Sequence, residues 1–422
     1  MLESFANFLQ NTGLYALISS GGIDAVKTII MIAIACVLLY LAIVKKFEPL
    51  LLLPIAFGML LSNLPMIKDS SAIMMHTEFF TNPEYMTDGK YINVGYICQH
   101  GGLLDLLYLG VKLGIYPPLI FVGIGCMTDF GPLIANPKSI LLGAAAQFGV
   151  FFTFVGALVL SALVPSINFG IKEAASIGII GGADGPTAIY VTKSLAPALL
   201  PAIAVAAYSY MALVPVIIPL VVKLLCTKKE LSINMKEQEK KYPSKTEIKN
   251  LRVLKIIFPI VVTTVVALFV PSAVPLIGML MFGNLVKEIG SNTFRLFDAA
   301  SNSIMNAATI FLGLSVGATM TTEAFLNWTT IGIVVGGFLA FALSIAGGIF
   351  FVKLVNLFSK KKINPLIGAT GLSAVPMASR VANEIALKYD PKNHVLQYCM
   401  ASNISGVIGS AVAAGVLISF LA

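Results

Sequence analysis

The chain has 422 residues, of which 57% are hydrophobic and only 11% are charged. Because soluble proteins usually carry about a quarter charged residues, this composition excludes an ordinary cytosolic enzyme, a disordered chain and a secreted disulfide scaffold. The formal net charge of +8 fits the basic cytoplasmic loops of a membrane protein. We therefore expect membrane lipid as a partner and no nucleic acid.

In chain order, the sequence divides into four predicted parts. An N-terminal segment over 1–24 can form an interfacial helix with one apolar face, and a loosely packed terminus is the alternative. A first membrane half over 25–226 includes an outside loop over 65–101, where acidic residues outnumber basic ones. A basic cytoplasmic linker over 227–253 leads to a second membrane half over 254–422.

Clusters of basic residues set the predicted orientation. Lys45 and Lys46 follow the first span, and residues 228–252 carry eight Lys or Arg against four Asp or Glu. A third cluster covers residues 360–362. Since Lys and Arg accumulate in cytoplasmic loops, we place all three clusters in the cytoplasm.

Long and short apolar runs alternate along both halves. The stretches 139–164, 331–352 and 395–422 contain no charge and are long enough to cross lipid. Shorter runs interrupted by Gly and Pro are poor simple spans; they cover 119–128, 176–191, 276–286, 304–316 and 366–377. We expect broken helices or re-entrant hairpins there, which lipid tolerates only inside protein or beside a water-filled cavity.

Weak internal similarity links the two halves at an offset of 190 residues. Ile120, Phe121 and Gly123 fall on Ile310, Phe311 and Gly313; Gly181, Pro186 and Ala188 fall on Gly371, Pro376 and Ala378; Tyr208 falls on Tyr398. Apolar chains coincide often by chance, but these matches cluster at short broken runs in corresponding positions. Such pairing is typical of a transporter site between inverted repeats.

The first candidate site is the run Gly-Gly-Ala-Asp-Gly-Pro-Thr at 181–187, in which Asp184 is the sole charge between Glu173 and Lys193. A charged Asp at mid-bilayer costs about 2.5–3.5 kcal/mol on insertion scales. The glycines and proline cannot continue a regular helix, so they free backbone carbonyls beside the carboxylate. This arrangement predicts an oxygen site for a small cation; the alternative is a protonated, hydrogen-bonded Asp at a helix break.

The second candidate site is the run 364–380, where Gly368, Gly371 and Pro376 again break the helix. Asn364 and Ser373 offer neutral oxygens, with helix capping as the alternative role. Arg380 could clamp a carboxylate, or it could extend to the interface.

Further polar residues lie in apolar surroundings. Tyr208 and Tyr210 point to different helix faces, so one could donate a proton into a cavity, and interfacial anchoring is the alternative. Asn403 lies in the uncharged last span, where polar side chains often join helices. Asp129 ends a short apolar run and could cap a turn. No Walker lysine motif, dinucleotide fingerprint or Gly-x-Ser-x-Gly occurs, so the chain has no evident means of hydrolysing ATP.

The chain resembles the beta subunit of the sodium-translocating decarboxylases, which act on oxaloacetate, methylmalonyl-CoA or glutaconyl-CoA. The resemblance runs almost end to end and is weakest over 65–102; its motifs lie at 45–50, 127–133, 181–187, 207–215, 364–380 and 406–411. It implies an all-α polytopic membrane protein with two inverted repeats, broken helices or re-entrant hairpins, and an elevator-type transporter architecture. It also implies a bacterial inner-membrane location.

The resemblance further implies a carboxybiotin decarboxylase that consumes a proton and exports Na+. Its expected partners are an alpha subunit carrying the carboxyltransferase and biotin carrier, a small gamma or delta membrane subunit, and further copies of itself. Biotin is expected on a partner and not covalently on this chain. The competing interpretation is a Na+-coupled carboxylate transporter without chemistry.

Site roles carried by the resemblance and the motifs fall into three groups. The expected Na+ ligands are Asp184, Gly182, Thr187, Ser373 and Asn403. The expected catalytic residues are Asp184, Tyr208, Tyr210, Ser373 and Arg380. Residues expected to bind carboxybiotin are Arg380, Asn364 and Gly368.

Overall fold

The computed structural model describes residues 12–46, 49–65, 75–88, 91–164, 169–242, 250–374 and 377–422. Within these ranges seven helices are long and apolar enough to cross a membrane, or nine if each of two bent pairs is one span. The seven are Gly22–Ile43, Ser139–Leu163, Leu251–Phe269, Pro271–Ile289, Ser291–Ala318, Trp328–Phe358 and Leu396–Leu421. The predicted all-α polytopic membrane fold is confirmed, with one short antiparallel pair, β1 (Met86–Thr87) and β2 (Tyr91–Ile92), in the described part.

The first half is a chain of mostly short helices. Its elements are α2 (Gly13–Ser19), α3 (Gly22–Ile43), α4 (Pro49–Asn63), η1 (Thr77–Phe80), η2 (Pro83–Tyr85), β1 (Met86–Thr87), β2 (Tyr91–Ile92), α5 (Val94–His100), α6 (Leu103–Leu113), α7 (Tyr116–Met127), α8 (Gly131–Ala135), α9 (Ser139–Ala146), α10 (Phe148–Leu163), α11 (Ile171–Gly178), η3 (Ile179–Gly182), α12 (Gly185–Leu195), η4 (Pro197–Leu199), α13 (Leu200–Ala212) and α14 (Val214–Leu225). The first eleven residues of the predicted interfacial segment lie outside the described residues.

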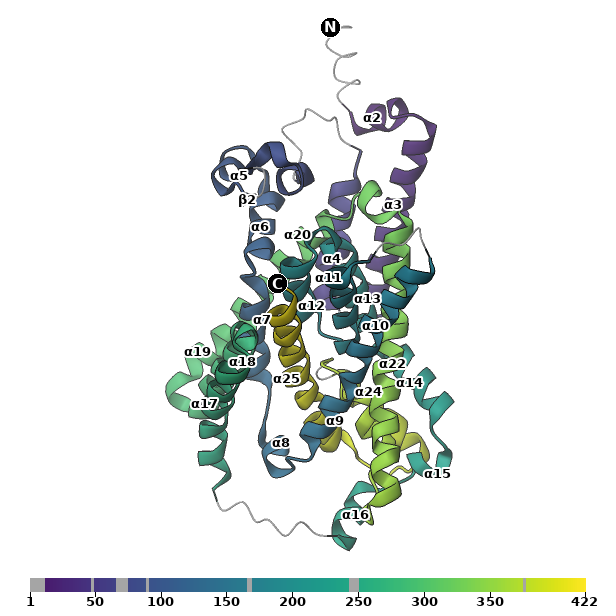
Figure 1. Ribbon diagram of the computed structural model, residues 1–422, viewed down its shortest axis with the longest axis vertical. Helices are drawn as coiled ribbons and strands as arrows, with labels where there is room; N and C mark the ends of the chain where they lie inside the picture. The colour runs from purple at the N-terminus through teal and green to yellow at the C-terminus, as the bar shows by residue number, and fades with distance from the viewer. Residues whose placement is uncertain are drawn as a thin grey trace.

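The second half has longer helices. Its elements are α15 (Lys228–Leu231), α16 (Met235–Lys241), α17 (Leu251–Phe269), η5 (Pro271–Ala273), α18 (Val274–Ile289), η6 (Ser291–Thr293), α19 (Phe294–Asp298), η7 (Ala299–Ile304), α20 (Met305–Ala318), α21 (Thr322–Phe325), α22 (Trp328–Phe358), α23 (Pro365–Ala369), α24 (Met377–Tyr389) and α25 (Leu396–Leu421). Helices α17 and α18 lie on one flank, α22 and α14 on the other, and α25 between them (Figure 1).

Broken helices occur at two of the five Gly- and Pro-rich runs and next to a third, 119–128, which itself lies in α7. Helices α6 and α7 meet at 72°, at a turn where Gly114 has a φ of +76° that favours glycine. The run 176–191 breaks between η3 and α12, and 366–377 breaks after α23.

The prediction of breaks at 276–286 and 304–316 is wrong. The first run lies inside the span Pro271–Ile289, where Pro271 and Pro275 occupy first-turn positions that tolerate proline. The second lies inside Ser291–Ala318, whose π-helical stretch η7 keeps the span continuous.

Glycines let two pairs of helices cross closely, one pair joining α4 to α20 and the other α7 to α18. A Cβ added to Gly58 would lie 2.1 Å from the carbonyl oxygen of Leu314, and one added to Gly283 would lie 2.0 Å from that of Val122. Each crossing therefore requires a residue without a side chain, and each joins a helix of the first half to one of the second.

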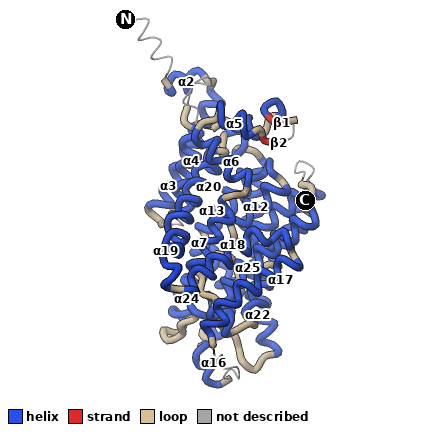
Figure 2. Tube along the Cα trace, turned by 90° about the vertical axis from the view of Figure 1, so that its left-hand side faces the viewer, coloured by secondary structure: helices blue, strands red, loops and turns tan. Residues whose placement is uncertain are grey.

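The predicted cytoplasmic linker is partly folded. Helices α15 and α16 lie at one end of the long axis, while α2, α5 and the β1–β2 pair lie at the other (Figures 1 and 2). The linker is tied to the second half because Asn234 donates to Asp390 at 2.9 Å and the Lys362 N–H donates to Gln238 at 3.0 Å. The basic cluster at 360–362 and the linker therefore lie at the same end of the molecule.

Candidate functional site

The first broken helix places Asp184 at the start of α12. Glycines end η3, and Ala183 then adopts a left-handed φ of +55°, which is unusual for a residue with a side chain. Asp184 is the N-cap of α12 and accepts a hydrogen bond from the Thr187 N–H at 3.1 Å. Only 4% of Asp184 is exposed, so the helix break carries its carboxylate into the protein interior.

The second broken segment meets the first at this carboxylate. After α23 the backbone runs without helix to Ser373, whose N–H donates to the Gly182 carbonyl at 3.1 Å. The Ser373 hydroxyl donates to Asp184 Oδ2 at 2.8 Å. The helix breaks in the two halves of the chain therefore contact each other through Ser373, Gly182 and Asp184.

Helix α25 supplies the third side of the site. The Ser410 hydroxyl donates to Asp184 Oδ2 at 2.8 Å. Asn403 is fully buried, and its amide group donates to the carbonyls of Thr370 at 3.3 Å and Leu372 at 2.6 Å. Asn403 therefore fixes the unwound segment next to Ser373.

Two buried oxygens beside this helix break have no hydrogen-bond partner within the described ranges, Gln147 Oε1 and the Tyr208 hydroxyl. Asn403 Oδ1, next to the second broken segment, is also unpaired among the described residues. The Thr187 hydroxyl interacts with Asp184 itself. Gln147 Oε1 lies beside Gly182, 3.5 Å from where a Cβ would stand. Buried polar atoms are normally satisfied. None of the ion pairs formed by described residues includes Asp184.

This set of atoms fits a small, hard cation. One carboxylate and several neutral oxygens are the ligand type that such ions prefer. No group of three or more His, Cys, Asp or Glu forms a metal site in the described part of the chain, so the site does not resemble one for zinc or iron. A bound monovalent cation would compensate the buried charge and satisfy the unpaired oxygens together.

Comparison with known proteins places the chain in a family. The family model described as Na+-transporting oxaloacetate decarboxylase beta subunit matches residues 27–421. The chain belongs to this family. It is 50% identical to the methylmalonyl-CoA decarboxylase subunit beta of Propionigenium modestum over 99% of both chains.

Other relatives carry related names. The chain is 46% identical to the probable oxaloacetate decarboxylase beta chain of Vibrio cholerae over the full length of both chains. It is 48% identical to the glutaconyl-CoA decarboxylase subunit beta of Acidaminococcus fermentans, covering 93% of this chain and 92% of the relative. The protein is therefore a beta subunit of the Na+-transporting decarboxylase family and a multi-pass protein of the bacterial inner membrane.

The structure separates the two tyrosines of this beta subunit. Tyr208 is 1% exposed, and its ring packs on Gly185, directly after Asp184. Tyr210 points to α22, where its hydroxyl donates to the Val334 carbonyl. Only Tyr208 therefore lies beside the carboxylate.

Three further residues of the second motif do not contact Asp184. Asn364 caps α23 and donates to the carbonyls of Leu231 at 2.9 Å and Ile233 at 3.1 Å, so it ties the linker over 227–253 to α23. Gly368 packs against the backbone of Gly348 in α22. Arg380 is exposed on α24, and the ion pairs of the described residues do not include it.

Two residues of the site were missed in the sequence. Ser410 belongs to the motif 406–411, but one serine among several in an apolar helix gives no sign that it faces a carboxylate 226 positions away. Gln147 is the only amide side chain in the uncharged run 139–164, and it lies at the junction of α9 and α10. Polar side chains are rare in membrane spans, so the isolated Gln147 in an uncharged run was the feature of the sequence that could have indicated its place in the site.

Proposed function

We propose that this beta subunit decarboxylates carboxybiotin with proton consumption and uses that step to export Na+. The observation that carries the proposal is a buried carboxylate, Asp184, that has three hydrogen-bond donors, no basic partner in the described residues, and unpaired oxygens around it. The comparisons support it, since the relatives reported above are all named as decarboxylase beta subunits. Because these relatives are named as decarboxylase subunits, the competing interpretation of a Na+-coupled carboxylate transporter without chemistry is not favoured.

In this proposal Na+ is the cargo and binds at Asp184. Its further ligands are the Gly182 carbonyl, the hydroxyls of Thr187 and Ser373, and the Asn403 amide oxygen, which has no hydrogen-bond partner among the described residues. Ser410 and Gln147 extend this set. Ser373 joins the second broken segment to the first, so filling the site links the two breaks through one ion.

The chemistry requires a proton at the biotin ring. When the bond between the ring nitrogen and the carboxylate carbon breaks, CO2 leaves, and the electron pair remains on nitrogen and takes up a proton. The Tyr208 hydroxyl is a suitable donor because it is buried beside Asp184 and no described residue bonds to it. Tyr210 supports the same helix by bonding to α22.

Arg380 is proposed to receive the carboxylate of carboxybiotin. It is exposed on α24, which follows the second broken segment, and a guanidinium pairs with carboxylates in bidentate fashion. Asn364 and Gly368 support this role indirectly, because they fix α23 against the linker and α22. Exporting one charge against 100 mV costs about 2.3 kcal/mol, which decarboxylation must supply.

We infer that the two membrane halves are inverted repeats that move in an elevator fashion. The close crossings support the repeat. Gly58 of α4 contacts Leu314 of α20, and the equivalent contact joins Gly283 of α18 to Val122 of α7. In the same way, Gly317 of α20 contacts Ile55 of α4, and Gly125 of α7 contacts Leu280 of α18. In a two-fold relation between the halves, α4 therefore corresponds to α18 and α7 to α20. The crossings relate α7 to α20 at an offset of 192 and α4 to α18 at an offset of 225, so their register differs from the offset of 190 in the sequence, and Ile120 corresponds to Leu312 instead of Ile310.

The proposed partners are an alpha subunit with carboxyltransferase and biotin-carrier functions, a small gamma or delta membrane subunit, and further copies of this chain. The biotin would arrive on the partner, at the end of the molecule that carries the basic linker. The family description names a beta subunit, which supports a complex of several chains.

The test is Asp184→Asn in the assembled complex. The amide can still cap α12, but it lacks the charge that holds Na+, so we expect Na+-dependent decarboxylation to be lost while carboxyl transfer to biotin continues. The matched control is Asp88→Asn, at an exposed position with a left-handed φ of +54° that asparagine adopts readily. Normal Na+-dependent turnover in Asp184→Asn would refute the proposal.

A further inference from the structure

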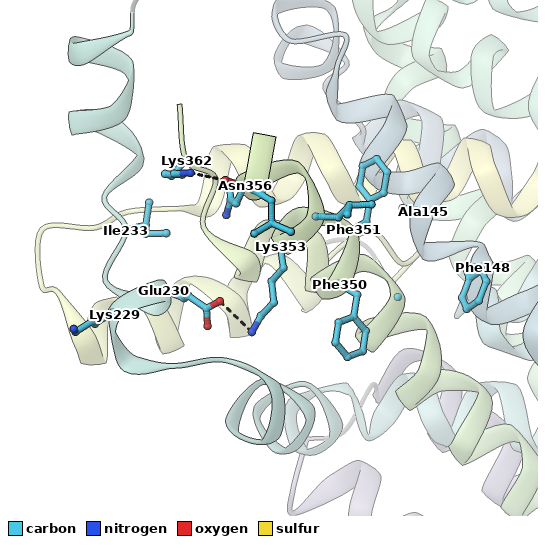
Figure 3. A pocket seen from close by; sticks show the side chains of 13 residues that line it. Ala145, Phe148, Lys229, Glu230, Ile233, Phe350, Phe351, Lys353, Asn356 and Lys362 are labelled. Carbon is cyan, nitrogen blue, oxygen red and sulfur yellow. Dashed lines mark hydrogen bonds and ion pairs between the residues drawn. The ribbon is translucent and has the colours of Figure 1, made fainter. Parts of the chain in front are cut away.

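A groove lies at the end of the molecule that carries the basic linker. It has a volume of about 990 Å³ and lies between α9, α10, α15 and α22. Figure 3 shows Lys229 and Glu230 on one side of it and Ala145 and Phe148 on the other. The groove is therefore amphipathic, with charged residues toward α15 and apolar residues toward α9 and α10.

Helix α22 supplies the apolar wall. Gly347, Phe350, Leu354 and Leu357 line the groove at helical spacings of three and four, so they form one face. Phe350 is 55% exposed, Leu354 52% and Leu357 76%. A continuous exposed apolar face beside a groove suits a hydrocarbon chain, and Gly347 adds depth because it has no side chain.

The other end of the groove is basic. Lys353 is paired with Glu230 at 3.0 Å, so these two charges compensate each other. Lys229 is exposed, and Lys362 donates to the Asn356 carbonyl; neither has an acidic partner among the ion pairs of the described residues. Two lysines therefore give this end a net positive charge.

The depth of the groove matches the boundary between lipid tails and headgroups. Helix α22 has 31 residues, so it is about 46 Å long and exceeds the hydrocarbon core of about 30 Å. The stretch 331–352 is uncharged, and Lys353 is the first charge after it. Gly347 and Phe350 thus lie within the uncharged stretch, while Leu354, Leu357 and Lys362 follow its end, so the groove spans the point where the charge-free part of the chain stops.

We propose that this groove binds one anionic phospholipid of the cytoplasmic leaflet. The phosphate lies near Lys229 and Lys362, and an acyl chain lies along Phe350 and Leu354. An anionic headgroup is favoured over a zwitterionic one because the polar end has two uncompensated lysines. The bound lipid contacts α9 and α10 of the first half and α22 of the second half, and the site is independent of the proposed chemistry.

The test measures lipid binding to the full-length chain in detergent by native mass spectrometry. The probes are phosphatidylglycerol and phosphatidylcholine with the same acyl chains. A lysine near an anionic lipid contributes about fivefold in affinity, so Lys229→Gln with Lys362→Gln should weaken phosphatidylglycerol binding about 25-fold. Phosphatidylcholine binding should not change. The matched control is Lys236→Gln with Lys240→Gln, on α16 and outside the groove.

A second pair of variants tests the apolar wall. Gly347→Leu should block the groove for both lipids. Gly336→Leu is its control on the same helix, since a Cβ there meets nothing within 4 Å. Equal affinity for the two lipids, or an equal loss in both lysine pairs, would overturn the proposal. If Gly347→Leu fails to fold, the surface lysine pairs decide the matter alone.

Discussion

The contact between Gly185 and Tyr208 gives a sharp prediction about the geometry of the site. A Cβ added at Gly185 would lie 2.2 Å from Tyr208 Cε1 and 2.7 Å from both Cδ1 and Cζ. Carbon atoms pack at about 3.5–4.0 Å, so the ring would have to move by more than about 1 Å. Tyr208 is only 1% exposed, and the ring therefore has no solvent to move into.

Gly185→Ala should consequently destabilise the protein by about 1–3 kcal/mol, the usual cost of overpacking a core. Displacement of a reacting group by about 1 Å can reduce the rate about 100-fold, so decarboxylation should fall more than stability suggests. Thermal unfolding of the purified chain and Na+-dependent decarboxylation by the complex measure the two effects separately.

The control and a double-mutant cycle make the reasoning refutable. Gly156→Ala makes the same change in α10 where a Cβ meets nothing within 4 Å, so it should be neutral or slightly stabilising. Combining Gly185→Ala with Tyr208→Ala should cost less than the sum of the two changes, because the methyl group occupies space that the ring has left. If Gly185→Ala behaves like Gly156→Ala, or if the two changes are additive, the ring does not pack where we place it.

Three further predictions concern the ligands, the helix crossings and one ion pair. Ser410→Ala removes one neutral oxygen from the proposed Na+ site, and loss of a supporting ligand typically costs about 10–100-fold in metal affinity, so the Na+ concentration for half-maximal activity should rise at least about 10-fold; an unchanged Na+ dependence would exclude Ser410 from the site. Gly58→Ala and Gly283→Ala should each lower thermal stability by about 1–3 kcal/mol, since both Cβ atoms meet a carbonyl oxygen, and tolerance at only one position would argue against the repeat. Partial burial alone would raise the pKa of Asp129, but hydrogen bonds from Lys255 and Gly131 and the charges of Lys255 and Lys287 hold it below its ordinary value. A lowered pKa stabilises the folded state at pH values above the ordinary aspartate pKa, and this contribution is lost as pH falls through the folded-state value. Because Asp129 is 46% exposed, Asp129→Asn should cost no more than about 1 kcal/mol near pH 7. The difference should disappear in thermal melts under strongly acidic conditions, and a difference that grows on acidification would contradict the assignment.

Much of the site could be predicted because its chemistry is local in the sequence. Asp184 is a lone charge in an apolar run, and the glycines and proline around it cannot form a regular helix, so the residue and the break were both evident. Ser373 was evident for the same reason in the second motif. In each case a rule that concerns only neighbouring residues was sufficient.

The remainder depends on which helix faces meet. Glycines in 276–286 look like helix breakers, but Gly283 instead allows α18 to approach α7. Ser410 and Gln147 reach the site only through the packing of α25 and of the α9–α10 junction, which no local pattern encodes. Asn364 looks like an oxygen ligand, yet its hydrogen bonds cap α23 and hold the linker.

Equilibrium binding of radioactive 22Na+ to the purified full-length chain tests the central claim most directly. The wild-type chain should bind the ion saturably, and excess unlabelled Na+ should displace it. A carboxylate about 4 Å from the ion contributes about 4 kcal/mol at an effective dielectric constant of 20, so Asp184→Asn should weaken binding about 1000-fold. Equal 22Na+ binding by the wild-type chain and a folded Asp184→Asn variant would contradict the account.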